Sequence, residues 1–545
     1  MKRLIKKIAY IVCISVMFFT TGCNDIFNQV TELNTSRLFR PISFAATVNK
    51  TQVTLSWVAV NNATSYTLQV SLDSLDYSKP VVDTTLTQLS YVKEFAGATT
   101  YYAKIRANAI DTTKIKNSGF NSTLSFKTQS ENIFGINVPV MTAMNTIDVK
   151  WLAKANVTSL VLTASDNTVT TVNITSDEAA AGEKVIASLP NSNYTIQIYN
   201  KDILRGKTSA LVEGDYYLDS GADLPTNITN ATAGQVIILA PGVNFPMGGG
   251  TYRFSKDVKV RGLSATNRPI VCMSGATPTA TSSMLGFVDQ STMNYVKFEN
   301  IDFTGYCDNN TAAIKIGYLF NNNLMTTVKS LSFKNCNLHN FGNTPMRLQA
   351  SKGQSIDTLS FNSCVINEIG FSSTYAIVNS NSADYFKNIY FNNCTVYNFK
   401  GSLVLRTAAA PVVAIMGNLN ITNCTINQSM QDPSSARYLI DANGTTFTNG
   451  INIKNCILGS SGAAIGANGM RYLTGTIVNI TGTYYTSDYV DDPISVPITS
   501  TSIKSKMTPY SGASTALWNN PLTGDFTLKD AAFPGKGTAG DLRWY

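Results

Sequence analysis

A short sequence motif recurs through the second half of the chain, and each clear copy of it contains a cysteine. The copies are LSFKNCNLHNFG (331–342), LSFNSCVINEIG (359–370), IYFNNCTVYNFKG (389–401), LNITNCTIN (419–427) and INIKNCILG (451–459). Their cysteines follow one another at intervals of 28, 30, 30 and 32 residues, and looser copies lie at 258–263, 296–303 and 478–485. A repeat of this period predicts stacked units that share one continuous core.

The spacing of apolar residues within each copy predicts a bend. Apolar side chains stand five and three residues before the cysteine, as Leu331 and Phe333 do, and resume at the cysteine and two residues after it. Each half follows the strand period of two, but a step of three joins the halves, so one straight strand cannot keep both inward. We expect the turn at the residue before each cysteine, which is Asn335, Ser363, Asn393, Asn423 or Asn455. Asn tolerates the left-handed backbone that such a turn requires.

The asparagine bend and the inward-facing ladder resemble the pectate-lyase-like superfamily, and GQVIILAPGVNF (234–245) resembles its first coils. This resemblance implies a right-handed parallel β-helix over residues 215–545, with 524–545 as a C-terminal cap. It is specific for the fold and says little about activity.

The first half of the chain predicts two β-sandwiches. Residues 40–129 alternate in short apolar runs, with Trp57 in one of them, and FAGATTYYAKI (95–105) resembles the tyrosine-corner strand of fibronectin type III modules. Residues 133–213 repeat the pattern more loosely around Trp151 and Tyr194, which predicts a second Ig-like or fibronectin-like module. The fold class is therefore all-β: two Ig/fibronectin III-like sandwiches followed by a right-handed parallel β-helix. We interpret both sandwiches as spacers, because their identifiable aromatic residues occupy core positions.

The amino-terminal sequence predicts a lipoprotein export signal (1–22) followed by a linker (23–39). A basic start precedes a short apolar run that ends in Thr20-Thr21-Gly22-Cys23, and the run is too short to span a membrane. It resembles the lipobox of Bacteroidetes lipoproteins, although Thr20 stands where an aliphatic residue is usual. The resemblance implies an acylated Cys23, outer-membrane lipid as one partner, and a location on the cell surface.

The composition of the chain excludes several kinds of partner and site. The formal charge is +8, but the export signal contributes four of these charges, so we expect no nucleic-acid partner. A single histidine excludes sites that need two imidazoles. No CxxC pair or paired acidic column is present, so we expect no metal and no cofactor. Seven cysteines remain after Cys13 and Cys23, and we expect free, buried thiols rather than disulfides.

One basic column suggests a binding site. Arg347, Arg406 and Arg437 follow their cysteines by 11, 12 and 13 residues, and Tyr375 stands in the intervening coil. They would face outward if Leu348, Leu405 and Leu439 face inward. Arginine pairs with carboxylates and tyrosine stacks on sugar rings, so these four residues predict a groove for an anionic glycan. The alternative is an ordinary solvated strand face.

The whole arrangement resembles surface lipoproteins of Bacteroidetes polysaccharide-utilisation systems. This implies capture of a polysaccharide, for example one containing uronate, for a neighbouring glycan transporter. One alternative is a metal-free polysaccharide lyase with an arginine or Lys352 as its base. A second alternative is a structural or adhesive surface protein. The missing acid pairs favour binding over hydrolysis.

Overall fold

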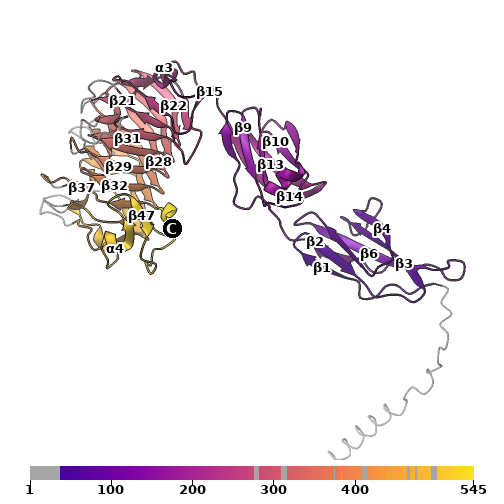
Figure 1. Cartoon of the computed structure of the whole chain (residues 1–545). Coiled ribbons are helices and arrows are strands. Elements are labelled where there is room, and N and C mark those ends of the chain that lie inside the picture. The colour runs from indigo at the N-terminus through magenta and orange to yellow at the C-terminus, as the bar shows by residue number, and fades with distance from the viewer. Residues whose placement is uncertain are drawn as a thin grey trace, which may run out of the picture.

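The computed structural model describes residues 37–545 except 275–281, 308–315, 374, 382, 408–413, 436, 463–466, 473–474 and 492–499. The predicted export signal, Cys23 and most of the predicted linker therefore lie outside the described residues. The described chain forms two sandwiches in succession and then a long stack of coils, as Figure 1 shows. No helix among the described residues is long and apolar enough to cross a membrane.

The first sandwich packs a three-stranded sheet, β1-β2-β5, on a four-stranded sheet, β4-β3-β6-β7. Its strands are β1 (Ala45–Asn49), β2 (Gln52–Ser56), β3 (Ala63–Ser71), β4 (Val82–Leu86), β5 (Ser90–Glu94), β6 (Thr100–Ala109) and β7 (Leu124–Lys127). Trp57 is buried between the sheets, and the Tyr101 hydroxyl accepts a hydrogen bond from the Ala96 amide at 3.1 Å. Both features agree with the predicted fibronectin-like module.

The second sandwich has the same arrangement, with sheets β12-β9-β8 and β11-β10-β13-β14. Its elements are β8 (Val140–Ala143), β9 (Thr146–Lys150), β10 (Ser159–Thr163), β11 (Val169–Asn173), α2 (Ser176–Ala181), β12 (Glu183–Ile186), β13 (Ser192–Asn200) and β14 (Ile203–Val212). Trp151 is buried, and Tyr194 donates to the Pro190 carbonyl at 2.9 Å. The looser sequence pattern thus encodes a second module of the same type.

Residues from β15 onward form a parallel β-helix whose coils contribute one strand to each of three sheets. The first sheet contains, in order, β15 (Tyr216–Leu218), β16 (Gln235–Leu239), β19 (Val258–Gly262), β22 (Ser291–Glu299), β25 (Thr326–Lys334), β28 (Ser355–Asn362), β31 (Tyr385–Asn392), β35 (Asn418–Thr422), β39 (Ile451–Lys454) and β42 (Val478–Thr481). The second sheet contains β17 (Asn244–Pro246), β20 (Ile270–Cys272), β23 (Asp302–Thr304), β26 (Asn337–Phe341), β29 (Val365–Ile369), β32 (Thr395–Phe399), β36 (Thr425–Asn427), β40 (Ile457–Leu458), β43 (Tyr484–Tyr485) and β45 (Thr508–Pro509).

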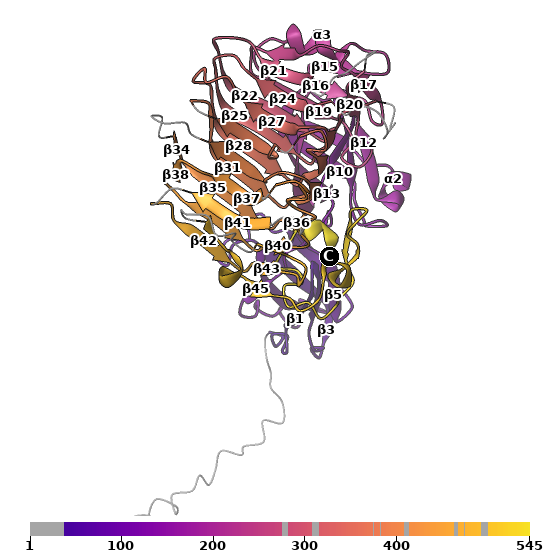
Figure 2. The same cartoon turned by 90° about the vertical axis from the view of Figure 1, so that its left-hand side faces the viewer.

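The third sheet contains β18 (Tyr252–Phe254), β21 (Ser283–Phe287), β24 (Tyr318–Asn322), β27 (Thr344–Leu348), β30 (Val378–Asn381), β33 (Val404–Thr407), β37 (Arg437–Ala442), β41 (Ala467–Tyr472) and β44 (Ser500–Thr501). Only β44 among them pairs antiparallel, with β41. Outside the three sheets lie α3 (Leu224–Thr229), β34 (Ala414–Met416), β38 (Thr445–Phe447), η1 (Lys504–Lys506), α4 (Ser514–Leu517), β46 (Trp518–Asn520), β47 (Asp525–Leu528) and η2 (Leu542–Trp544). Figure 2 shows the coils stacking from α3 toward the C-terminal segment.

The bend between the first and second sheets lies where the sequence predicts it. Asn335, Ser363, Asn393, Asn423 and Asn455 all have a positive φ, between 51° and 55°. Each bend turns the chain while the apolar residues on both sides remain inside, with Leu331, Phe333, Cys336 and Leu338 fully buried. The three-residue step is therefore the corner of the coil.

The five repeat cysteines are free and buried, as predicted. The thiols of Cys364, Cys394, Cys424 and Cys456 each donate to a backbone carbonyl of the preceding coil, at 3.3–3.4 Å. Beside them Phe298, Phe333, Phe361 and Phe391 stack at centroid distances of 5.0–5.3 Å. Burial raises the pKa of the Cys364 and Cys394 thiols well above the ordinary value, so they stay protonated.

The expectation of free thiols throughout is wrong for two residues, because Cys272 and Cys307 form a disulfide. Neither cysteine occupies the corner position of the repeat. Cys272 ends β20, and Cys307 follows β23 in the next coil. Thiols stacked in register point the same way, whereas these two leave different positions of adjacent coils and can meet.

The C-terminal segment folds back along the outside of the second sheet. Trp518, Phe526 and Phe533 form a separate apolar cluster with Tyr397 and Ile457 of the coils. The segment reaches back to the coil of Cys364, where Arg543 donates to the backbone carbonyls of Ser363 and Cys364 at 2.7 and 3.1 Å. The predicted cap thus covers the side of several coils.

Candidate functional site

Strand pairing in the third sheet defines which side chains share its outer face. Arg347 pairs with Asn321 on one side and Asn379 on the other. The column continues through Leu405, Asp441 and Arg471 in the following coils. The neighbours of Arg347 on β27, Met346 and Leu348, are buried in the core, so Arg347 faces outward as predicted. We call this set of residues the outer column.

Two tyrosines hold the Arg347 guanidinium. Its carbon lies 4.4 Å from the centre of the Tyr375 ring, and its Nη1 donates to the Tyr318 hydroxyl at 2.9 Å. Such cation–π contacts orient a guanidinium and preserve its charge. Arg347 has no acidic partner among the described residues, and its Nε–H lacks a hydrogen-bond acceptor there. The structure thus presents a positioned, uncompensated cation on the surface of the coil.

The predicted proximity of Arg347 and Tyr375 is confirmed, and Tyr318 joins them from the preceding coil. Burial raises the pKa of Tyr318, and the ring of Tyr375 adds to this effect while Arg347 opposes it. Tyr318 therefore keeps its proton at neutral pH and remains a hydrogen-bonding group. Tyr318 was not among the predicted residues, because its coil carries no cysteine in the repeat register and matches the repeat only loosely.

The prediction that Arg406 faces outward is wrong. It is fully buried, it pairs with Ser380, and its Nη1 donates to the Asp384 carbonyl at 2.7 Å. Val404 occupies the inward position on β33, so Leu405 faces out and Arg406 faces in. Burial lowers the pKa of Arg406 to about 10, while the nearby Asp384 acts in the opposite direction. A register error of one residue reversed the predicted faces.

Arg437 is also not part of the outer column. It stands four residues before Asp441 on β37, which displaces it by about 13 Å along the strand. Its Nη2 and Nε lie 2.6 and 2.8 Å from one carboxylate oxygen of Asp432. The Asp432 side chain is 1% exposed, so this pair anchors a turn, and Arg437 is already neutralised.

In the coil of Arg437 the outer-column position belongs to Asp441, and Arg471 follows it in the next coil. Arg471 binds both oxygens of Asp441, at 2.6 and 2.9 Å, and lies 4.5 Å from the Tyr438 ring. This arrangement resembles the Arg347 cluster geometrically, but here a protein carboxylate fills the place that a ligand carboxylate would take. The charge of Arg471 is therefore already paired with a carboxylate of the protein.

The outer column contains a second free cation, Arg253, at the start of the stack. Arg253 pairs with Gly286, and a Cβ at Gly286 would lie 2.8 Å from Arg253 Nη1, so glycine makes room for the guanidinium. Its Nη1 is buried without a hydrogen-bond partner among the described residues. Three coil steps separate Arg253 from Arg347, or about 14 Å at the usual strand spacing. The TYRFS segment around it has no nearby cysteine, so the repeat alignment did not find it.

The described residues contain no group of three or more His, Cys, Asp or Glu side chains that could hold a metal ion. Lys352, the base considered for a lyase, is exposed in the turn before β28. The outer column thus carries two guanidinium groups, those of Arg347 and Arg253, without an acidic partner among the described residues.

Comparisons with known proteins describe parts of the chain. Residues 419–544 match a family model described as a domain of unknown function, DUF5123, which spans the last coils and the C-terminal segment. No curated protein matches.

Among solved structures, a two-module fibronectin type III segment of chicken tenascin is 16% identical, covering 32% of this chain and 98% of that one, with a TM-score of 0.17. The FN1–FN3 domains of chicken CNTN1 are 15% identical, covering 33% and 68%, with a TM-score of 0.15. The chicken interferon gamma receptor alpha chain is 13% identical, covering 32% and 98%, also with a TM-score of 0.15.

Proposed function

We propose that this protein is a cell-surface lipoprotein that binds an anionic polysaccharide on the third sheet of its β-helix. Its lipid anchor would be Cys23, and its two sandwiches would hold the binding domain away from the membrane. The observation that carries the proposal is Arg347, a cation positioned by two aromatic rings and lacking an acidic partner within the described chain.

The ligand class follows from the groups that the outer column offers. A carboxylate can pair with the free guanidinium groups of Arg347 and Arg253, and a sugar face can lie against Tyr375. Asn321 lies beside Arg347 and is partly exposed, so its amide can meet a sugar hydroxyl, whereas Asn379 on the other side is buried. Because coils repeat at about 4.8 Å, the column suits an extended chain with regularly spaced charges.

Export is supported by a separate feature, the Cys272–Cys307 disulfide. Disulfides form in oxidising compartments and are rare in the cytosol. A neighbouring transporter that receives the glycan remains part of the proposal and follows from the resemblance to polysaccharide-utilisation lipoproteins.

The test is retention of the protein in gels that contain pectin, alginate or a glycosaminoglycan. We expect at least one acidic polysaccharide to retain the unmodified chain, less strongly as salt increases. Arg347→Ala should weaken that retention about tenfold, because a charge-assisted hydrogen bond is lost. Arg40→Ala is the matched control, since it removes an exposed arginine from the first sandwich and should leave retention unchanged.

Equal retention of the Arg347→Ala variant on every acidic polysaccharide that retains the parent would contradict the proposal. Absorbance from unsaturated uronate products, measured in the same incubations, distinguishes binding from the lyase alternative.

A further inference from the structure

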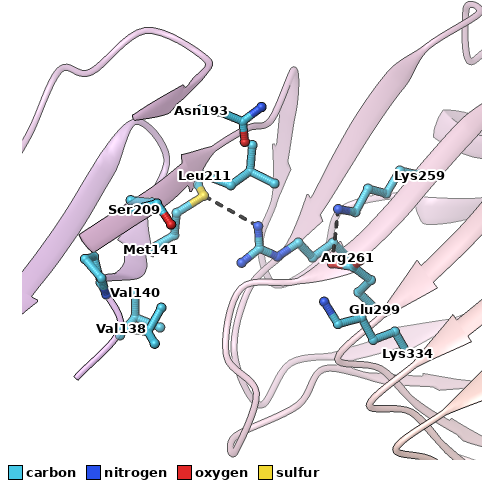
Figure 3. A pocket seen from close by; sticks show the side chains of 12 residues that line it. Val138, Val140, Met141, Asn193, Ser209, Leu211, Lys259, Arg261, Glu299 and Lys334 are labelled. Carbon is cyan, nitrogen blue, oxygen red and sulfur yellow. Dashed lines mark hydrogen bonds and ion pairs between the residues drawn. The ribbon is translucent and has the colours of Figure 1, made fainter. Parts of the chain in front are cut away.

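A cavity of about 400 Å³ lies between the second sandwich and the β-helix, away from the outer column. Figure 3 shows its two walls. One wall comes from the start of β8, the start of β13 and the end of β14, and the other from the outer face of the first sheet. The volume falls in the range of small-molecule binding sites.

The wall from the first sheet is basic. Lys259 lies 2.6 Å from Glu213 and 3.0 Å from Glu299, and Arg261 lies 2.7 Å from the same Glu213 oxygen. Lys334 is the third cation of this wall, and it has no acidic partner among the described residues. Three cations therefore face two carboxylates, which leaves one positive charge uncompensated at the cavity.

Arg261 reaches across the cavity, with Nη1 3.6 Å from the Met141 sulfur, as Figure 3 shows. Its Nε is buried and has no hydrogen-bond partner in the described chain. That N–H is inaccessible from the cavity, so a ligand there can meet only the terminal nitrogens of this guanidinium.

The wall from the sandwich contains both apolar and polar side chains. Val138 and Leu211 present apolar surface, and Ser209 and Asn193 place a hydroxyl and an amide beside it. Apolar carbons fit the C–H face of a sugar ring, while hydroxyl and amide groups fit its hydroxyls. A free ammonium group opposite them fits a carboxylate.

We infer that this cavity binds a sugar acid, with its carboxylate on Lys334 and its ring against the sandwich wall. The inference rests on the proposed function, because it takes the carboxylated sugar from the glycan class proposed there. It adds a second subsite to which the second sandwich contributes half of the wall, so that module would be part of the binding surface.

The rest of a glycan chain has a polar path out of the cavity. Lys334 is followed in its column by Asn362 and Asn392, whose amides are joined by a hydrogen bond of 2.9 Å. The column ends with Thr422 and Lys454 before the last coil. A chain held at Lys334 could therefore continue over side chains that form hydrogen bonds.

The experiment titrates the full-length chain with glucuronate, galacturonate and neutral glucose, using ligand-observed NMR. We expect one of the two sugar acids to bind and glucose to bind more weakly. Lys334→Ala should weaken sugar-acid binding about tenfold. Lys329→Ala is the matched control, because both lysines are exposed on β25 and only Lys334 lines the cavity.

The inference is overturned if neither sugar acid binds, or if Lys334→Ala binds it as tightly as the parent. If the cavity inference fails but polysaccharide retention still depends on Arg347, the proposed function is supported and only the cavity subsite is ruled out. Conversely, binding that depends on Lys334 but not on Arg347, in a protein that no acidic polysaccharide retains, supports the cavity and contradicts the proposed function.

Discussion

An arginine in a coil of this kind can serve the surface or the core, and one step along the strand decides which. Arg347 and Arg406 lie two coils apart in neighbouring columns of the third sheet, yet one contacts tyrosines outside the coil and the other is fully buried. Their local sequences, PMRLQ and LVLRT, both place arginine next to apolar residues. The face could be assigned only after the pairing of β27, β30 and β33 was known.

The buried carboxylate of Asp432 makes a prediction about acid stability. Burial alone would raise its pKa, but hydrogen bonds from Ser434 and the charge of Arg437 lower it below the ordinary 3.8. Because the folded-state pKa is depressed, the stabilisation is complete above the unfolded-state value near 3.8 and is lost as pH falls through the folded-state value. We expect the unfolding free energy to decrease in that acidic range.

Asp432→Asn removes this titration. The variant should be less stable than the parent by about 1–3 kcal/mol at pH 7, since it loses hydrogen bonds to a charged group. As pH falls from 3.8 through the lower folded-state value, the two proteins should converge. Urea unfolding at a series of pH values measures both effects, and parallel curves for the two proteins would show that Asp432 is not responsible.

At the scale of the element, the corner of each coil is determined by backbone conformation. Five residues that precede the repeat cysteines share a φ near 52°, and four of them are asparagine. The left-handed region is costly for most L-residues, and Asn and Gly adopt it most readily. These corners were predictable because the requirement is local and recurs in every coil.

Asn423 allows a direct test of the corner. Its φ is 51°, and its Oδ1 has no hydrogen-bond partner among the described residues, so substitution acts mainly through the backbone. Asn423→Ala should lower the unfolding free energy by about 1–2 kcal/mol. Asn423→Gly should recover most of this loss, because glycine adopts positive φ without steric cost. Chemical denaturation compares the three proteins, and an alanine variant as stable as the parent would argue against strain at this corner.

For the whole molecule, ion pairs at the two junctions determine how the modules are joined. Arg205 of the second sandwich contacts Glu131 at 2.7 and 2.8 Å and Glu94 of the first sandwich at 3.1 Å. Glu213 joins Lys259 and Arg261 at the junction with the β-helix, where Ile238 and Leu263 also pack against the second sandwich. Such contacts favour a stiff stalk over a flexible string of modules.

Removing Arg205 should loosen the first junction, because two carboxylates would lose a largely buried partner. We expect Arg205→Ala to broaden the distribution of overall dimensions in small-angle X-ray scattering. Lys207→Ala is the control, since Lys207 is exposed two residues further along β14 and should leave the scattering unchanged. Identical scattering from all three proteins would mean that the junction does not depend on this ion pair.

The sequence alone determined the features that are local and repeated: the β-helix, its asparagine corners, the inward cysteines and the two sandwich cores. Each of these follows from a periodicity of two or from one residue with a special backbone conformation. The same pattern recurs in each copy of the repeat. Only the tertiary structure decided which arginines are free, which cysteines meet, and where the sandwich and the coils enclose a cavity. Those outcomes depend on strand register and on contacts between residues far apart in the chain, which no local pattern encodes.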